Sequence, residues 1–283
     1  MNNGSRICLG GGDANRHSIG DYIVSGENIL SAWNEFKKGK RKKSDIQRFE
    51  FFLEENIWKM HDELTEKVYR HNSYTPFYIT DPKLRHIHKA TVRDRLLHQA
   101  VFRVLYPIFD KIFIYDSYSC RINKGTHRAV NRLDNFLRKA SHNYHAPIYA
   151  LKCDISRFFD SVDQAILKGL IKRRVNEGTV NEILDIIINS FESKTRKGIP
   201  LGNVTSQLFA NVYLHELDRF CKHTLNIKYY LRYCDDFIIL GPSREHLKEY
   251  ISLIQTFLIN HLNLTLHPRK IIIRKLSQGI DFL

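Results

Sequence analysis

The sequence is poor in the residues that mark secreted, membrane and fibrous proteins. Its 283 residues include 5 cysteines, 7 prolines and 14 glycines. The cysteines are scattered and form no CxxC pair, so neither a disulfide framework nor a zinc site is expected. Apolar runs such as Ile186 to Ile188 fall far short of the roughly 18 residues that a membrane span requires. These absences predict a cytoplasmic protein with no membrane partner.

Acidic residues are also scarce relative to basic ones. The chain has 30 Asp and Glu against 44 Lys and Arg, which gives a formal net charge of +14 at pH 7. Cations near phosphates gain affinity by releasing condensed counterions, so nucleic acid is favoured as a partner over a merely basic surface. The 43% of hydrophobic residues can fill a sizeable core, which excludes a disordered chain.

The order of the apolar patterns predicts an α+β fold with an antiparallel sheet. Apolar residues alternate from Tyr149 to Ile155, as in a half-buried strand, and residues 229–240 read as two strands joined at Asp235 and Asp236. Because helices and strands do not alternate as repeated βαβ units, a doubly wound fold is the lesser alternative.

Several helix and strand boundaries carry local signals. Apolar residues at helical spacing precede Pro107, which is expected to end that helix. Ser161 with the glutamine three residues later resembles a capping box, which predicts the start of another helix. Ser243 is expected to cap a long helix. Residues 270–275 and 279–283 read as a last pair of short strands.

Three acids stand out as candidate metal ligands. Asp154 lies on the polar face of its predicted strand, and Asp235 with Asp236 lies at the tip of an apolar hairpin. Adjacent carboxylates repel each other unless cations neutralise them, and hard oxygen ligands suit Mg²⁺ or Mn²⁺. For the hairpin pair alone, a plain Asp-rich turn is an equally good reading.

The segments around these acids carry a family resemblance. Residues 149–162 (YALKCDISRFFDSV), 198–207 (GIPLGNVTSQ) and 233–236 (YCDD) resemble, in this order, motifs A, B and C of reverse transcriptases. The resemblance extends from about Tyr22 to Leu283, and its specificity comes from several motifs that agree in order and spacing. A YxDD sequence alone would be weak evidence for this family.

The resemblance implies a right-hand polymerase fold with fingers and palm. The expected parts are a flexible tail at 1–20, fingers at 21–129 and 162–203, and palm at 130–161 and 204–283. The helical thumb of the family would follow the last residue, so it is expected to be missing, either through truncation or because another chain supplies it. Weak or non-processive synthesis would follow.

The implied activity is that of an RNA-directed DNA polymerase. Asp154 and Asp235 would hold two Mg²⁺ ions, with the carbonyl of Ile155 in one metal shell and Asp236 at the edge of the site. Mn²⁺ could substitute for Mg²⁺. The partners would be a template RNA, a primer, the cDNA product and deoxynucleoside triphosphates. A polymerase of RNA from ribonucleotides is disfavoured by Phe159, which matches the steric gate that excludes a 2′-hydroxyl.

Further substrate contacts are implied by position in the motifs. Leu201 and Gly202 would lie against the nascent base pair, where a residue without a Cβ lets the backbone come close. Lys83 and Arg85 would clamp the triphosphate, because a guanidinium matches phosphate geometry. Lys270 resembles the lysine that protonates the leaving pyrophosphate. The alternative for Phe159 is a ring in the core, and for Gly202 it is an ordinary turn glycine. For Lys83 and Arg85 the alternative is surface charge, and for Lys270 it is a lysine at a strand edge.

Four basic residues are candidate contacts to the template. They are Arg93 and Arg95 at the start of a helix, and Arg121 and Lys124 in the segment SCRINKGTH. Simple solvation is the alternative for each.

The second motif departs from most of the family. Leu201 replaces the usual glutamine, and Ser206-Gln207 replaces Ser-Pro. This pattern resembles the reverse transcriptases of bacterial and phage diversity-generating retroelements, which implies error-prone copying and a small basic accessory protein. A retron, abortive-infection, group II intron or CRISPR-associated enzyme is the alternative. A non-catalytic RNA-binding subunit with a truncated polymerase fold is the alternative from another class.

Overall fold

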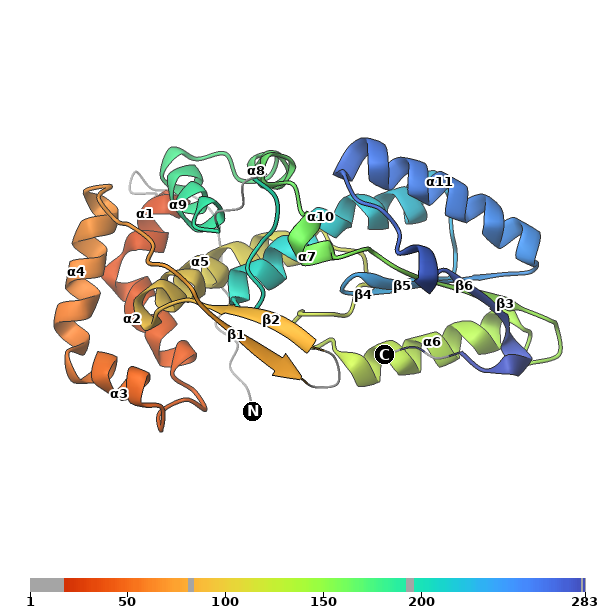
Figure 1. Ribbon diagram of the computed structural model, residues 1–283, viewed down its shortest axis with the longest axis horizontal. Coiled ribbons are helices and arrows are strands. Elements are labelled where there is room, and N and C mark those ends of the chain that lie inside the picture. The colour runs from red at the N-terminus through yellow and green to blue at the C-terminus, as the bar shows by residue number, and fades with distance from the viewer. Residues whose placement is uncertain (1–17, 81–83, 192–195, 281, 283) are drawn as a thin grey trace, which may run out of the picture.

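The computed structural model describes residues 18–80, 84–191, 196–280 and 282. A helical region and a four-stranded sheet with helices on both faces lie next to each other along the long axis (Figure 1). All strand pairs in both sheets are antiparallel, so the predicted α+β class with an antiparallel sheet is confirmed. No helix in the described part of the chain is long and apolar enough to cross a membrane.

The helical region is built on capped amphipathic helices. Ser18, Ser25 and Thr91 each accept a backbone N–H at a helix start. Its helices are α1 (Ile19–Val24), α2 (Gly26–Phe36), α3 (Ser44–Phe51), α4 (Leu53–Thr65), α5 (Val92–Asp110) and α9 (Gly178–Asn189). Helix α1 begins within the range expected for a flexible tail, and residues 1–17 lie outside the described part.

The main sheet has the strand order β4-β5-β3-β6. Its strands are β3 (Tyr149–Asp154), β4 (Tyr230–Tyr233), β5 (Asp236–Gly241) and β6 (Ile272–Lys275). Leu151 and Cys153 face the core shared with α10 (Val204–Arg219) and α11 (Arg244–Leu262), while Ala150 faces α6 (Thr126–Ala140). The predicted alternation of side chains along β3 is therefore confirmed, but the strand is not half-buried, because Ala150 and Asp154 on the face of Lys152 are buried as well.

A second sheet is the hairpin of β1 (Thr75–Thr80) and β2 (Leu84–Lys89). The backbone N–H of His88 donates to the carbonyl of Leu201 at 3.1 Å, so the hairpin is held against the loop that precedes α10. This contact brings two segments together that are more than a hundred residues apart in the sequence.

Two helix boundaries differ from the prediction. Pro107 lies inside α5, which continues to Asp110. The ring of a proline fixes φ near a helical value, so α5 continues through Pro107 at the cost of one N–H donor and crowding of the carbonyl four residues earlier. Ser161 ends the short helix α7 (Phe158–Ser161), whereas Asp163 caps α8 (Gln164–Lys172) by accepting two backbone N–H groups.

The predicted strand pair at the C-terminal end is only partly correct. Ser243 caps α11 as expected, and Ile272–Lys275 form β6. Lys270 instead ends a 3-10 turn, Pro268–Lys270, because Pro268 lacks the N–H that a ladder requires. Among the described residues after β6 there is no further strand, and Leu276–Gln278 form a 3-10 turn. The remaining irregular helix is a π-helix, Phe220–Thr224, after α10.

Candidate active site

The β4–β5 hairpin presents two of the three predicted acids. Tyr233 pairs with Asp236 across the hairpin, which leaves Cys234 and Asp235 as a two-residue loop. Cys234 has φ 55°, the positive value that such tight turns require at a central position. Asp235 is therefore held at the tip of the turn, and Asp236 is the first residue of β5.

The third acid comes from the neighbouring strand. Asp154 is the last residue of β3, and its Cα partner in β5 is Asp236. The N–H of Ile155 donates to the carbonyl of Asp235 at 3.3 Å, and the N–H of His267 donates to the carbonyl of Asp154 at 2.8 Å. These backbone bonds bring the three predicted acids to one edge of the sheet.

The carboxylates at this edge repel one another. Burial, followed by the charges of Asp154 and Asp235, raises the pKa of Asp236 from its ordinary value of 3.8 to about 6. The pKa of Asp235 is raised as well, first by burial and also by the charge of Asp154. The site thus carries more negative charge than the protein itself compensates.

Two lysines bring positive charge to the acids: Lys270 pairs with Asp154, and the charge of Lys152 acts on Asp236. The Nζ of Lys270 lies 2.6 Å from Asp154 Oδ2. This hydrogen bond raises the pKa of Lys270, so the ammonium group keeps its proton at neutral pH. The structure therefore joins Lys270, which the sequence connected only by motif, to the three acids.

The donor set fits a hard divalent cation. Among the described residues, no three acidic, histidine or cysteine side chains form a ready metal-ligating group. Instead, Asp154 is paired with Lys270, and Asp235 and Asp236 lie close enough to disfavour each other's charge. Carboxylate oxygens are the ligands that Mg²⁺ and Mn²⁺ prefer, and their mutual repulsion favours a bound cation. The carbonyl of Ile155 as a further ligand stays a prediction.

The loop before α10 contains the predicted nucleotide-site residues Leu201 and Gly202. Gly202 has φ +113°, and a Cβ there would come within 2.9 Å of Ile87 Cγ2 in β2. Only a glycine fits this backbone without a shift of its neighbour. The same strand β2 carries Arg85, which is exposed. Lys83 lies outside the described residues.

The two rings of the short helix α7 have different surroundings. Phe158 is fully buried in the core, whereas Phe159 is only partly buried. The carbonyl of Phe159 accepts the N–H of Ile199 at 2.8 Å, so the ring is held beside the segment that leads into the Leu201 loop. Of the two, Phe159 has the exposure that a contact to a sugar requires.

Arg93 and Arg95 are engaged within the protein. Arg93 pairs with Glu63, and its guanidinium lies 3.9 Å from the ring centroid of Tyr69. Arg95 Nη2 lies 2.9 Å from Asp45 Oδ2. Their roles as template contacts stay predictions.

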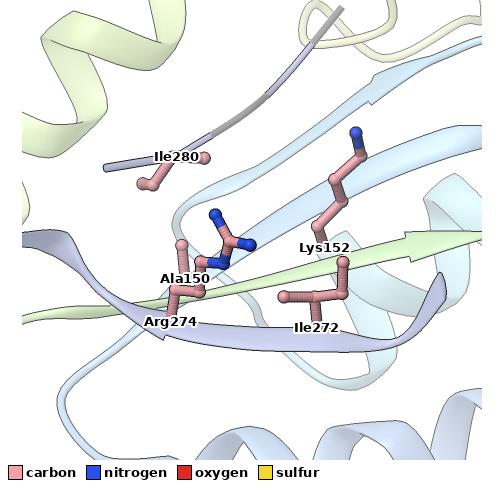
Figure 2. Close-up of a pocket in the computed structure, with 5 residues that line it drawn as sticks. All are labelled: Ala150, Lys152, Ile272, Arg274 and Ile280. Atoms are coloured by element: carbon pink, nitrogen blue, oxygen red, sulfur yellow. The ribbon is translucent and has the colours of Figure 1, made fainter. Parts of the chain in front are cut away.

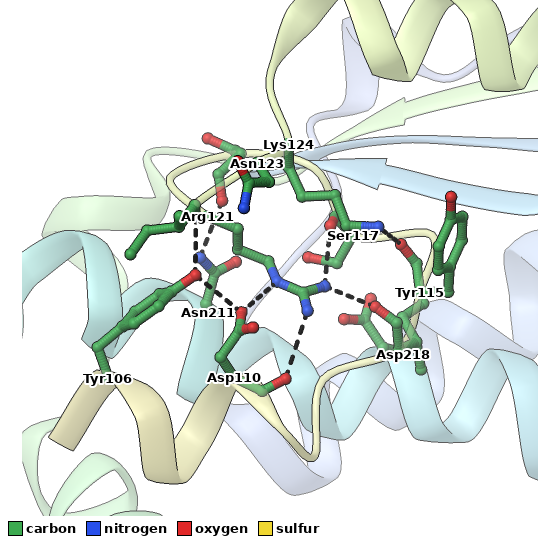
Figure 3. Close-up of polar contacts among 12 residues, drawn as sticks. Tyr106, Asp110, Tyr115, Ser117, Arg121, Asn123, Lys124, Asn211 and Asp218 are labelled. Carbon is green, nitrogen blue, oxygen red and sulfur yellow. Dashed lines mark hydrogen bonds and ion pairs between the residues drawn. The ribbon is translucent and has the colours of Figure 1, made fainter. Parts of the chain in front are cut away.

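Arg121 and Lys124 lie in the loop between α5 and α6 (Figure 3). Arg121 donates through Nε to Asp110 at 2.7 Å and through Nη1 to the carbonyls of Ile114 and Ser117. Its side chain is 6% exposed, so its geometry favours a structural role. Lys124 Nζ lies 3.5 Å from the ring centroid of Tyr115, and its template contact also stays a prediction.

Sequence reasoning missed a buried ion pair beneath the acidic turn. Arg232 in β4 and Asp218 in α10 are both 0% exposed. Two donors of Arg232 reach the two oxygens of Asp218 at 2.7 Å each, and the hydroxyl of Tyr230 donates to the same carboxylate at 2.7 Å. The available signal was an arginine at an inward-facing strand position, which requires a buried partner.

The same arginine is connected to the turn. Its Nη1 donates to the carbonyl of Cys234 at 2.9 Å and to Asn211 Oδ1 at 3.3 Å, and its Nη2 donates to Ser117 Oγ at 3.1 Å. All the polar groups of Arg232 are thus satisfied, which a buried guanidinium requires. The network fixes the backbone that carries Asp235.

Comparison with known proteins agrees with this geometry. Residues 80–283 match the family described as "Reverse transcriptase (RNA-dependent DNA polymerase)". The chain belongs to the reverse transcriptase family. The three acids at the sheet edge lie within the matched residues, as do the loop before α10 and Lys270.

Two relatives of this family member are a bacterial intron protein and an Escherichia coli protein. The chain is 27% identical over 209 residues to the group II intron-encoded protein LtrA of Lactococcus lactis subsp. cremoris, covering 70% of this chain and 33% of LtrA. It is 25% identical over 170 residues to protein YkfC of Escherichia coli (strain K12), covering 57% of this chain and 44% of YkfC. The chain thus spans less than half the length of either relative.

Solved structures of telomerase have a similar fold. The telomerase of Candida tropicalis, in complex with a TWJ fragment of telomeric RNA, matches with a TM-score of 0.55 and 14% identity, covering 80% of this chain and 46% of that one. The telomerase of Candida albicans, in complex with such a fragment, matches with a TM-score of 0.54 and 10% identity, covering 80% and 49%. At these identities the likeness concerns the fold alone.

Proposed function

We propose that this chain catalyses RNA-directed DNA synthesis at the sheet edge formed by β3 and the β4–β5 turn. The observation that carries the proposal is the placement of Asp154 opposite Asp236, directly beside Asp235. Asp154 and Asp235 are 81 residues apart in the sequence, and the three acids carry more negative charge than Lys270 and Lys152 balance. Membership of the reverse transcriptase family supports the reaction class.

The acids would act as ligands for the metal ions. Bound Mg²⁺ or Mn²⁺ would supply charge stabilisation at the attacking 3′-hydroxyl and at the leaving pyrophosphate. Asp154 and Asp235 would hold the ions, Asp236 would support them from the edge, and Lys270 would then be displaced from Asp154. A protonated Lys270 freed in this way would donate its proton to the leaving group.

The neighbouring residues would position the substrates. Arg85 on the exposed β2 strand would bind the triphosphate through its guanidinium. The backbone at Gly202 would lie under the nascent base pair, where the absence of a Cβ leaves room. Phe159 would block a 2′-hydroxyl. The palm would comprise the sheet with α10 and α11, and the fingers would comprise the helical region with the β1–β2 hairpin.

Primer extension on an RNA template tests the proposal. Deoxy- and ribonucleotides are offered separately with Mg²⁺ or Mn²⁺, and Asp235→Asn is compared with Glu249→Gln, an exposed change on α11. Incorporation of deoxynucleotides that Asp235→Asn abolishes and Glu249→Gln preserves supports the polymerase. RNA binding without incorporation under every metal condition would favour a non-catalytic RNA-binding subunit.

The steric role of Phe159 has its own test. Phe159→Ala should admit ribonucleotides, because the smaller side chain leaves space for a 2′-hydroxyl. The matched change Phe158→Leu alters the neighbouring buried ring and should leave the preference for deoxynucleotides intact. No gain of ribonucleotide incorporation in Phe159→Ala would remove this assignment.

We further propose that the enzyme is of the diversity-generating type. The support is Leu201 in place of the family's usual glutamine, together with Ser206-Gln207. A side chain without a polar group holds the nascent base pair less firmly, which would lower fidelity. The resemblance to this type further implies that errors concentrate at template adenines. A small basic accessory protein and a dedicated RNA belong to this proposal. Sequencing of products from a defined RNA tests it, and uniform errors across the four bases would favour the retron or intron types.

A further inference from the structure

A pocket lies where α5 and α8 pack on α10 (Figure 1). Its volume is about 140 Å³, and its lining comes from the end of α5, the end of α8 and the middle of α10. For comparison, the hollow in Figure 2, between the β3–β6 pair and the segment that carries Ile280, measures only about 50 Å³. We refer to the larger cavity as the α10 pocket.

The floor of the α10 pocket is apolar. Four of its lining side chains are at most 7% exposed, namely Phe109, Phe113, Leu170 and Val212. A cavity of about 150 Å³ with such a lining holds one benzene-sized ring. The α10 pocket therefore suits a single aromatic ring and is too small for the two fused rings of a purine.

One polar side chain interrupts this floor. His215 is 8% exposed, and its Nδ1 is buried without a hydrogen-bond partner among the described residues. Burial lowers the pKa of His215, so the imidazole is neutral at pH 7 and has one donor and one acceptor nitrogen. A buried nitrogen without a partner costs free energy. The pocket therefore favours a ring with polar atoms at its edge over a hydrocarbon ring.

The rim of the α10 pocket is basic. Arg173, Arg174 and Arg219 line it and are exposed. Arg173 pairs with Glu216, which also lines the pocket, at 3.5 Å between Nη1 and Oε2. Within the residues that the structure describes, Arg174 and Arg219 form no ion pair and no side-chain hydrogen bond, although the charge of Arg219 acts on His215. Because a guanidinium fork matches phosphate geometry, this rim suits a phosphate next to the bound ring.

The α10 pocket is separate from the candidate active site but shares a helix with it. Its residues on α10, between Val212 and Arg219, lie at helical spacing along one side of the helix. On the neighbouring side, Asn211 and Asp218 bond to Arg232 beneath the acidic turn. A ligand in the pocket therefore contacts the helix that holds this network, whereas none of the three acids lines the pocket.

We propose that the α10 pocket binds a pyrimidine nucleotide, with the ring on the apolar floor beside His215 and the phosphate on Arg174 and Arg219. This class of ligand combines a single ring, polar atoms at the ring edge and a phosphate. The nucleotide is free or is one unit of a single-stranded RNA, since both present the same ring and phosphate. The site does not depend on the proposed polymerase function, because its residues lie outside the proposed metal and triphosphate sites.

Titration with small ligands provides the first test. The affinity of the chain for UMP is measured by calorimetry in EDTA, so that no metal-bound nucleotide contributes. UMP should bind at least about 10-fold more tightly than uridine or inorganic phosphate, each of which lacks half of the contacts. UMP should also bind at least about 10-fold more tightly than AMP, because the purine does not fit the floor. Equal affinities for AMP and UMP would overturn the assignment of the ring site.

Substitutions at the rim test the phosphate contact. Arg174→Gln and Arg219→Gln should each weaken UMP binding about 10-fold, because each removes a charged hydrogen-bond donor. Lys172→Gln is the matched control, since Lys172 is exposed at the same end of α8 and does not line the pocket. An equal loss with Lys172→Gln would show attraction to a basic surface only and would overturn the site.

A substitution in the floor tests the contact to the ring edge. His215→Phe keeps an aromatic ring but removes the ring nitrogens, so it should weaken UMP binding about 10-fold. The free energy of unfolding should stay the same or rise, because Nδ1 of His215 has no partner among the described residues. Unchanged UMP binding in this variant would overturn the placement of the ring beside His215.

An RNA oligonucleotide identifies the source of the nucleotide. An oligoadenylate with one central uridine is compared with the same oligonucleotide without uridine, in the wild type and in Arg219→Gln. A gain from the uridine that Arg219→Gln removes, with tighter binding than that of UMP, supports a nucleotide within RNA. The absence of such a gain, with UMP binding retained, supports a free nucleotide.

The outcomes separate this inference from the proposed function. A loss of UMP binding in Arg85→Gln equal to that in Arg219→Gln would place the nucleotide at the proposed triphosphate site and overturn the α10 pocket. If the wild type extends primers but its UMP binding is insensitive to Arg174→Gln and Arg219→Gln, the polymerase stands and the pocket is wrong. If UMP binds as expected in a chain that does not extend primers, the pocket stands and the proposed catalysis is wrong.

Discussion

Asp235 lies in the β4–β5 turn and Asp218 is connected to that turn through Arg232, yet the two acids have contrasting electrostatic settings. Asp218 is fully buried, yet Arg232 and Tyr230 saturate its oxygens. Burial, together with the charges of neighbouring carboxylates, raises the pKa of Asp235 and of Asp236. A buried charge that is completely paired holds the structure together. Charges left unbalanced at an edge are available for cations that the protein does not itself provide.

The largest effect on activity is expected from Asp235→Asn. Removing a proposed metal ligand should reduce primer extension at least about 1,000-fold, or about 4 kcal/mol in activation free energy. The free energy of unfolding without metal should stay the same or rise, because one repelling charge is lost. Steady-state extension and urea unfolding measure the two quantities. A large loss of stability would contradict the view of Asp235 as an unbalanced charge.

The largest effect on stability is expected from Asp218→Asn. It leaves the Arg232 guanidinium buried without its counter-charge, which should cost about 3–5 kcal/mol in the free energy of unfolding. Asp134→Asn is the matched control, since it breaks the exposed pair with Arg138 and should leave the free energy of unfolding unchanged within the error of the measurement. Equal losses in urea unfolding would show that burial of the pair makes no difference.

The third prediction concerns pH and metal removal. A carboxyl whose pKa is raised by folding stabilises the fold at low pH, and this contribution is lost as the pH rises through the folded value, about 6 for Asp236. After allowance for solvent screening, about 1–2 kcal/mol of stability should disappear between pH 4 and 7 in EDTA. Asp236→Asn should remove that difference, and Mg²⁺ should stabilise the wild type more at pH 8 than at pH 5. Urea unfolding in both conditions checks this, and a metal effect independent of pH would contradict it.

A small loss of stability is expected from Lys270→Gln. The Lys270 side chain is 42% exposed, so its pair with Asp154 should contribute under about 1 kcal/mol to the free energy of unfolding. The rate of primer extension should fall by more than this loss of stability explains, since the proposed proton donor is lost. Comparison of kcat with the free energy of unfolding in urea separates the loss of activity from the loss of stability. Lys270→Arg, which keeps the charge, is the control.

The sequence predicted the elements that depend on local patterns. Alternation identified β3, and the apolar segments around Asp235 identified the hairpin. Motif order then placed both beside Lys270. The prediction that Pro107 ends its helix was wrong, because the fixed φ of proline is a helical value and α5 continues for three residues beyond it. Lys270 was expected in a strand and lies in a 3-10 turn.

The buried ion pair could not be predicted in the same way. Asp218 and Arg232 are 14 residues apart and meet only when α10 packs on β4. Each looks like an ordinary charged residue in its own segment. A charge at an inward-facing position signals that a partner exists, but the tertiary packing decides which one.

The bond between His88 and Leu201 has an evolutionary consequence. It joins the β1–β2 hairpin to the loop before α10 through a main-chain N–H and a main-chain carbonyl. Side-chain replacement at either position leaves both groups in place. Homologues could therefore diverge at these positions and still inherit the same mechanical link between the two segments, while Gly202 next to it has no such freedom.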